Sequence, residues 1–108
     1  MAQSKTIPVA IRPYVFGYLS ALEADGTPVQ AAYVFGSWIN GKPHRWSDID
    51  VCVVSPAFRT WKKKVELLAK ARTEDFFTIE PHGVHPKDFN PNSNSLVHEV
   101  IEHGIKVK

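Results

Sequence analysis

Residues 29–55 read VQAAYVFGSWINGKPHRWSDIDVCVVS, and this stretch decides the fold. The apolar run over residues 29–35 is typical of a buried β-strand, and it stops at a Gly-Ser pair. Residues 38–47 are rich in turn formers, so we expect a short helical turn and a loop there. Residues 48–55 predict a second strand. The stretch therefore encodes two strands joined by a polar connection.

The second predicted strand has two chemically different faces. Because side chains alternate along a strand, Ile49, Val51 and Val53 share one face. The opposite face carries Asp48, Asp50, Cys52 and Val54. Two carboxylates on one face repel each other, which costs free energy unless a positive charge lies between them.

Two long helices are predicted around these strands. The first spans residues 8–24 and has Pro13 in its first turn. Its apolar residues at helical spacing are Ile11, Val15, Leu19 and Leu22. The second helix spans residues 56–72. Its apolar stripe consists of Phe58, Trp61, Val65, Leu68 and Ala69.

A third strand is expected over residues 76–80, because the sequence FFTIE is mostly apolar and Pro81 stops it. A loop containing proline, glycine and histidine follows. The last helix spans residues 95–102 and is capped by Gly104. The order helix, strand, turn, strand, helix, strand, helix indicates an α/β (α+β) fold, a small mixed β-sheet with helices packed on it.

Length and composition fit one compact domain over residues 1–108. Hydrophobic residues make up 44% and charged residues 22%, the balance of an ordinary soluble protein. The net charge of +2 is too small to argue for nucleic-acid binding. No long apolar run or apolar signal core is present, so we expect no membrane span and no secretion. The single cysteine, Cys52, forms no internal disulfide, which agrees with a cytoplasmic location.

The residues between the two central strands suit phosphate and metal chemistry. A strand that ends in Gly36-Ser37 before a helical turn presents backbone N–H groups and a hydroxyl to phosphate oxygens. Asp48 and Asp50 supply the oxygen ligands that Mg²⁺ prefers. Two such ions stabilise the attacking and leaving oxygens of a phosphoryl displacement. Glu80, on the next strand, is the best third carboxylate, both as a ligand and as the base for an acceptor hydroxyl.

Gly36-Ser37, a ten-residue gap and the Asp48-x-Asp50 pattern resemble the minimal nucleotidyltransferases of the DNA polymerase beta superfamily. The likeness runs over nearly the whole chain, from the opening helix to the final VIEHGIKV segment. It implies a nucleotidyltransferase fold, Mg²⁺ or Mn²⁺, and an NTP substrate, for which we expect ATP. It also implies that Gly36 and Ser37 hold the triphosphate, and that Asp48, Asp50 and Glu80 bind the metal and act in catalysis.

One position departs from the pattern of this family. Many relatives carry an arginine just before the glycine that corresponds to Gly41, whereas this chain has Asn40. Lys42 and Arg45 are close by in the sequence, and we expect them to supply the positive charge for the phosphates.

The resemblance predicts a metal-dependent enzyme that transfers a nucleoside monophosphate, AMP from ATP, to an acceptor hydroxyl. Minimal domains of this family are typically encoded beside a helical HEPN protein, and they resemble antitoxins that adenylylate the toxin. We therefore expect a HEPN-type partner in a toxin–antitoxin system. A domain this small often shares its active cleft with a neighbour, so a homo-oligomer is a further expectation. Neither a membrane nor nucleic acid is expected as the main partner.

Two other functions compete with this prediction. The first is a binding module that neutralises or scaffolds a helical partner without turnover. Asn40 favours it, whereas intact Asp48, Asp50 and Glu80 favour the enzyme. The second is a small-molecule nucleotidyltransferase, such as one acting on aminoglycosides, although these usually need an extra domain for the acceptor.

The remaining reactive and aromatic residues are interpreted as structural. His82 and His85 resemble a zinc pair, but no cysteine pair accompanies them, so we interpret both as loop residues. His44 precedes the carboxylates and is a weaker candidate for contact with the nucleotide. Trp61 is assigned to the core because it belongs to a helix stripe, and Cys52 is expected to be packed.

Overall fold

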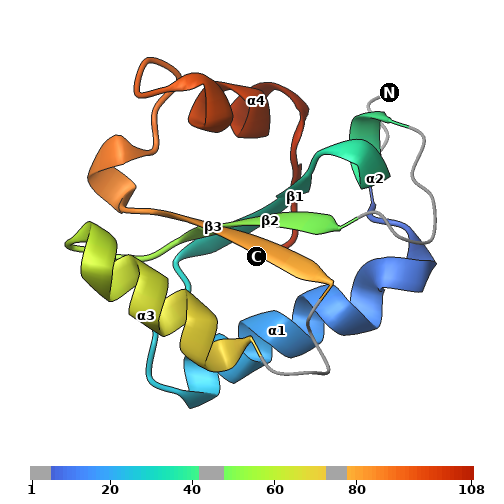
Figure 1. Ribbon diagram of the computed structural model, residues 1–108. Helices are drawn as coiled ribbons and strands as arrows, with labels where there is room; N and C mark the ends of the chain where they lie inside the picture. The colour runs from blue at the N-terminus through green and yellow to red at the C-terminus, as the bar shows by residue number, and fades with distance from the viewer. Residues whose placement is uncertain (1–5, 42–47, 73–77) are drawn as a thin grey trace.

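A computed structural model describes residues 6–41, 48–72 and 78–108, with the side chain of Asn40 left out. Helices and strands alternate along the chain (Figure 1). In order they are η1 (Val9–Ile11), α1 (Arg12–Ala24), β1 (Ala31–Phe35), α2 (Ser37–Asn40), β2 (Ile49–Val54), α3 (Trp61–Ala71), β3 (Ile79–Val84), η3 (Pro86–Asp88), α4 (Ser95–His103) and β4 (Ile105–Lys106).

The strands form one four-stranded sheet in the order β3-β2-β1-β4. β1 pairs antiparallel with both β2 and β4, whereas β2 and β3 run parallel. The sheet is therefore mixed, which confirms the predicted fold class. β4 was not predicted as a strand. It comes from the tail after Gly104, which caps α4 as expected.

One face of the sheet is covered by α1 and α3 (Figure 1). The predicted stripe of α1 is buried there, and Pro13 lies in the first turn of the helix. Val51 and Ile79 point into the same cluster from β2 and β3. The Tyr18 hydroxyl donates a hydrogen bond of 2.8 Å to the Leu68 carbonyl and so links α1 to α3. This face holds most of the apolar core.

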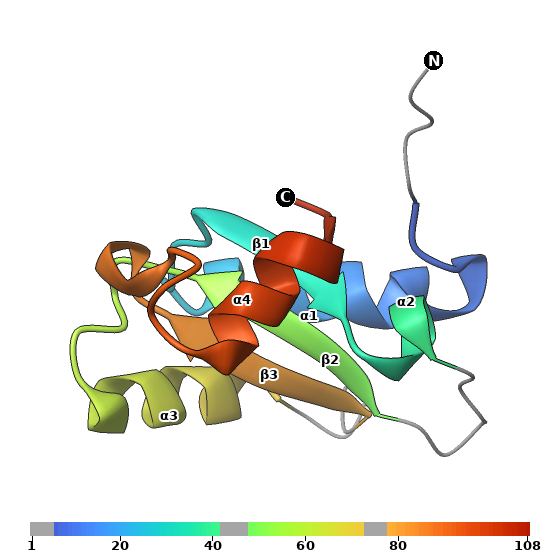
Figure 2. The same cartoon turned by 90° about the horizontal axis from the view of Figure 1, so that it is seen from above.

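On the opposite face, Phe89 stacks on Tyr33 of β1 with ring centroids 5.1 Å apart, and α4 lies across the sheet. A smaller apolar cluster lies beneath this helix, made of Phe35, Cys52, Val54, Val84, Val97 and Val100. The view from above shows that the first residues of β2 and β3 extend beyond α4 (Figure 2). The sheet is therefore uncovered by α4 at the end where these two strands begin.

The third strand differs from its prediction. It spans Ile79–Val84 and continues through Pro81 instead of ending there. β3 is one of the two edge strands of the sheet and, among the described strands, pairs with β2 alone, so a residue without an N–H is tolerated in it. Residues 76–77 of the predicted strand lie outside the described residues.

The start of α3 was also predicted incorrectly. The helix begins at Trp61, because the Thr60 side chain caps it by accepting a hydrogen bond from the Lys63 N–H at 3.1 Å. Trp61 is 74% exposed at this first position, so its assignment to the core was wrong. Leu68 and Ala71 are the residues that α3 buries. Within the described part of the chain, no helix combines the length and apolarity needed to cross a bilayer.

Candidate functional site

Gly36 shapes the end of β1 where the chain turns into α2. Its φ of 84° and ψ of −155° fall in a region that is essentially restricted to glycine. A Cβ atom at this position would overlap the side-chain carboxylate of Asp50. The glycine therefore lets the end of β1 lie directly against the carboxylate on β2.

Two of the predicted carboxylates lie side by side on neighbouring strands. In the register of the parallel pair, Asp50 on β2 is opposite Glu80 on β3. The Asp50 side chain is 24% exposed and that of Glu80 is 52% exposed. Both belong to the α4 face of the sheet, at the end that α4 leaves uncovered. Like charges so close together favour a cation between them.

His82 joins these carboxylates, although it was predicted to be a loop residue. Its Nε2 lies 3.0 Å from Asp50 Oδ1 and 4.0 Å from Glu80 Oε1. Its ring packs against Phe35 with centroids 5.2 Å apart. Because β3 continues past Pro81, the residues at positions 80 and 82 share one face. The alternating Glu-x-His pattern was the signal in the sequence, and ending the strand at Pro81 concealed it.

Asp50, Glu80 and His82 are suited to holding a metal ion. Each offers one ligand atom, and these atoms all lie within 4.8 Å of one another. Carboxylate oxygens bind hard divalent ions, and imidazole nitrogen adds affinity for transition ions. Asp48 is exposed immediately before β2 and lies outside this group of three.

Of the other residues predicted for the site, the structure describes Ser37 but not the two cations or the histidine of the loop. Ser37 is half-buried and is the first residue of α2, directly after Gly36. Lys42, Arg45 and His44 lie outside the described residues.

Cys52 lies on the same face of β2 as Asp50 but deeper in the sheet. The residue is fully buried, and this burial raises the pKa of its thiol to about 12. Because a thiol acts as a nucleophile or metal ligand only when it is ionised, Cys52 is a packing residue. This agrees with the prediction from the sequence.

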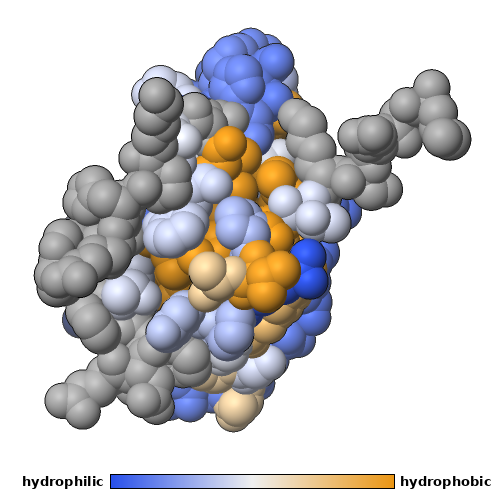
Figure 3. Space-filling view, turned by 90° about the vertical axis from the view of Figure 1, so that its right-hand side faces the viewer, coloured by the Kyte–Doolittle hydropathy of each residue, from blue (hydrophilic) through white to orange (hydrophobic). Residues whose placement is uncertain are grey.

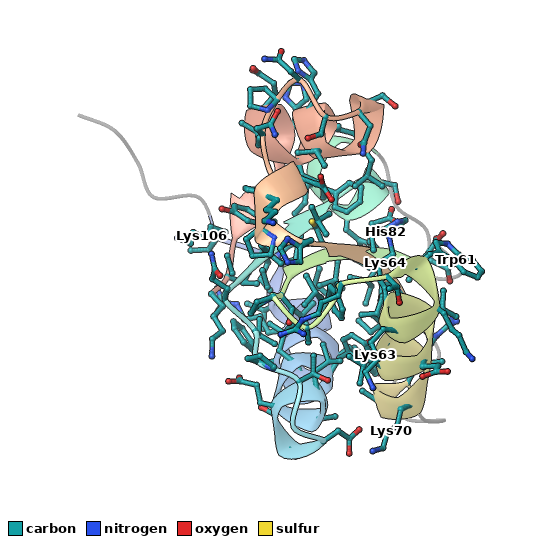
Figure 4. All side chains as sticks on the ribbon, turned by 90° about the vertical axis from the view of Figure 1, so that its left-hand side faces the viewer. Trp61, Lys63, Lys64, Lys70, His82 and Lys106 are labelled. Atoms are coloured by element: carbon teal, nitrogen blue, oxygen red, sulfur yellow. The ribbon has the colours of Figure 1, made fainter. Side chains whose placement is uncertain are left out.

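An open groove of about 520 Å³ runs along the free edge of β3 between α3 and the start of α4. Its wall includes His82, so the groove reaches the group of titratable residues. Figure 4 shows His82, Lys64 and Trp61 on the same side of the molecule. The aliphatic part of Lys64 lies against Gly83, near the end of β3.

Apolar side chains also gather on the face of the molecule shown in Figure 3. This is the end where α1 begins (Figure 1). Large apolar or aromatic side chains are exposed in this part of the chain, namely Val9 at 74%, Tyr14 at 44% and Phe16 at 45%. Exposed apolar groups of this kind are frequent at contacts between proteins.

The sequence profile described as "Polymerase beta, Nucleotidyltransferase" matches residues 20–108. The match includes the end of β1, all of β2 and β3, and α4. No curated protein matches the chain.

Several solved structures share the fold. One is a toxin–antitoxin crystal structure with AMP-PNP, 26% identical, covering 84% of this chain and 70% of that chain, with a TM-score of 0.55. Another is the crystal structure of the toxin–antitoxin MntA–HpeT with two aspartates replaced by glutamate. It is 21% identical, the match covers 83% of this chain and 68% of that chain, and the TM-score is 0.56. A candidate nucleotidyltransferase from Sulfolobus solfataricus is 18% identical. The match covers 81% of this chain and 82% of that chain, with a TM-score of 0.50.

Proposed function

Because this chain belongs to the polymerase beta nucleotidyltransferase family, we propose that it is a metal-dependent enzyme that transfers AMP from ATP to a hydroxyl group. The observation that carries the proposal is the placement of Asp50 and Glu80. They are directly paired on adjacent parallel strands, beside a glycine whose missing side chain makes room for the Asp50 carboxylate. Paired carboxylates at an uncovered sheet end suit the metal chemistry of phosphoryl transfer.

The metal is assigned to Asp48, Asp50 and Glu80. Their oxygens fit Mg²⁺ or Mn²⁺, since Asp50 and Glu80 already offer ligand atoms within 4.8 Å of each other. When bound, the ions neutralise the triphosphate and the charge that develops on pyrophosphate. Asp48 is exposed directly before β2, two residues from Asp50 along the chain.

The nucleotide is assigned to the turn between β1 and α2. The backbone N–H groups and hydroxyl of Gly36-Ser37 bind the phosphate oxygens, and Lys42 and Arg45 add positive charge. The acceptor oxygen attacks the α-phosphorus, and the bond between the α-phosphorus and the bridging oxygen to the β-phosphate breaks. Pyrophosphate leaves with that oxygen. Glu80 accepts the proton of the acceptor hydroxyl.

We assign the acceptor hydroxyl to a helical, HEPN-type toxin, with this chain as its cytoplasmic antitoxin. Support comes from the toxin–antitoxin structure with AMP-PNP, which is 26% identical to the chain. The groove along β3 gives a protein segment a route to the site, because its wall includes His82. Exposed apolar residues at the start of α1 offer further contact area for a partner.

Transfer of label from α-³²P-ATP tests this proposal. The purified protein is incubated with the nucleotide, Mg²⁺ or Mn²⁺, and the product of the neighbouring gene. We expect a labelled partner with the wild type and a loss of at least roughly a thousandfold in Asp50→Asn, since the ions contribute several kcal/mol to the transition state. Asp25→Asn, at the exposed end of α1, is the matched control and should label normally. Equal labelling by Asp50→Asn would refute the assigned site.

A binding module without turnover is the second candidate function. The observation that favours it is that Asp48 lies outside the group formed by Asp50, Glu80 and His82. A binding module would neutralise its partner in the Asp50→Asn variant as well as in the wild type. Neutralisation that is lost together with labelling supports the enzyme.

A further inference from the structure

We propose that His82 is a nitrogen ligand of the metal site, so that the site binds a first-row transition ion such as Mn²⁺ more tightly than Mg²⁺. The inference rests on the proposed function only in placing metal at Asp50 and Glu80. It adds a ligand that the sequence prediction assigned to a loop, and it names the class of ion that the site selects.

The distances fit a shared ion. Two ligand atoms that bind one ion at about 2.1 Å lie roughly 3 to 4.2 Å apart, depending on the angle between them. His82 Nε2 is 3.0 Å from Asp50 Oδ1 and 4.0 Å from Glu80 Oε1. Both distances fall in this interval. All three ligand atoms, including those of Asp50 and Glu80, lie within 4.8 Å of one another, so a shared ion requires the two carboxylates to approach each other by at most about 0.6 Å.

The surroundings of His82 hold its ring in position. The residue lies on a strand, its ring packs against Phe35, and its side chain is only 24% exposed. Nε2, the ring nitrogen that contacts Asp50, faces the carboxylates. A ligand held on a strand in this way loses little conformational freedom on binding an ion.

The set of donor atoms determines which ion is preferred. Mg²⁺ is a hard ion that binds oxygen, keeps several waters and dehydrates reluctantly. Imidazole is a ligand of transition ions, whose affinity for a given nitrogen-containing site rises from Mn²⁺ towards Cu²⁺. Replacing one oxygen donor by the His82 nitrogen therefore strengthens the binding of transition ions relative to Mg²⁺.

The competing role for His82 is that of a positioning residue, which orients Asp50 by a hydrogen bond and does not touch the ion. The variant His82→Gln separates the two roles. Its side-chain amide can still donate a hydrogen bond to Asp50, but it removes the imidazole nitrogen. His98→Gln, on the exposed face of α4, is the matched control.

The experiment uses Mn²⁺ as the probe. Pulsed electron paramagnetic resonance measures the coupling of bound Mn²⁺ to ¹⁴N, and calorimetry measures the affinities for Mn²⁺ and Mg²⁺. Circular dichroism confirms that each variant is folded. We expect ¹⁴N coupling in the wild type and in His98→Gln, and none in His82→Gln. Mn²⁺ affinity should fall at least about tenfold in His82→Gln, while Mg²⁺ affinity changes much less.

Two results would overturn the inference: absence of ¹⁴N coupling in the wild type, or an unchanged ratio of Mn²⁺ to Mg²⁺ affinity in folded His82→Gln. Neither readout depends on catalysis. Nitrogen coupling without AMP transfer would therefore support the ligand while refuting the proposed function. If the wild type transfers AMP but shows no nitrogen coupling, the proposed function is supported and His82 is not a ligand of the metal.

Discussion

The two faces of the sheet contain residues from the same strands but serve different purposes. On the face toward α1 and α3, Ile49 and Val51 from β2 and Ile79 from β3 are buried in a continuous apolar cluster. On the face toward α4, the neighbouring positions carry Asp50 and Glu80. The apolar cluster on this second face is smaller, and it reaches the carboxylates through Phe35, which lies opposite Asp50 in the pairing of β1 with β2.

This difference shows how a small domain can combine stability with a charged site. Burial on the first face supplies most of the stabilising apolar area, because two helices cover it. The second face can then leave polar groups at the uncovered end of the strands, where they remain accessible to solvent and ligands. Substitutions on the two faces should therefore affect different properties.

Substitution of Leu22 should cause the largest loss of stability. This α1 residue is fully buried against the first face, so Leu22→Ala removes apolar contacts and leaves a cavity. We expect the free energy of unfolding to fall by about 3 kcal/mol, measured by urea denaturation. The affinity of the folded protein for Mn²⁺ should stay close to that of the wild type. A large change in that affinity would show that the two faces are not independent.

Gly36→Ala should have a smaller effect on stability and a larger one on the site. The positive φ of this residue disfavours alanine, and the added methyl group displaces the Asp50 carboxylate. We expect a loss of about 1 to 3 kcal/mol in the free energy of unfolding. Calorimetry should show weaker Mn²⁺ binding. Gly26→Ala, also at a positive φ but with open space around it, is the control and should leave metal binding intact.

The sequence allowed the contributions of α1 and β2 to the first face to be predicted well, whereas Val65 and Ala69 of the predicted stripe of α3 are exposed. The helical spacing of Val15, Leu19 and Leu22 and the alternation of β2 depend on local periodicity, and all of these apolar residues are buried. The approach of Gly36 to Asp50 could be anticipated in part, because a glycine at a strand end permits close contact with a neighbouring group.

The second face was harder to predict because it depends on strand order. Pro81 ends a central strand but is tolerated in an outer one, and local sequence does not say which strand is outermost. The extension of β3 and the position of His82 were missed for this reason. The helix start at Thr60 was also missed, although threonine is a favoured N-cap.

Cys52 gives a test of burial on the second face through pH. Burial raises the pKa of its thiol from 9.0 to about 12, so the folded state holds this proton where the unfolded chain has lost it. The contribution of the Cys52 thiol to the free energy of unfolding is therefore fully present below about pH 9. It decreases as the pH rises towards 12, by up to about 1.4 kcal/mol per pH unit. Burial also raises the pKa of Tyr18, which adds to the effect at higher pH.

The measurement is urea denaturation at pH 8.5 and 10.5 for the wild type and Cys52→Ala. We expect the variant to lose less stability between these two pH values than the wild type, because only the wild type has this thiol. Equal losses would show that Cys52 ionises as readily in the folded protein as in the unfolded chain.

Trp61→Ala should change stability least, although tryptophan is the largest side chain. A tryptophan in the core would lose about 3 to 5 kcal/mol on truncation, whereas one that is 74% exposed should lose no more than about 0.5 kcal/mol. Phe58→Ala is the matched comparison, because Phe58 is only 4% exposed and should lose about 3 kcal/mol. Urea denaturation of the two variants separates these cases. A loss above about 2 kcal/mol in Trp61→Ala would restore the core assignment made from the sequence.

If the variant is as stable as the wild type but binds its partner more weakly, Trp61 is exposed because it contacts that partner beside the groove along β3.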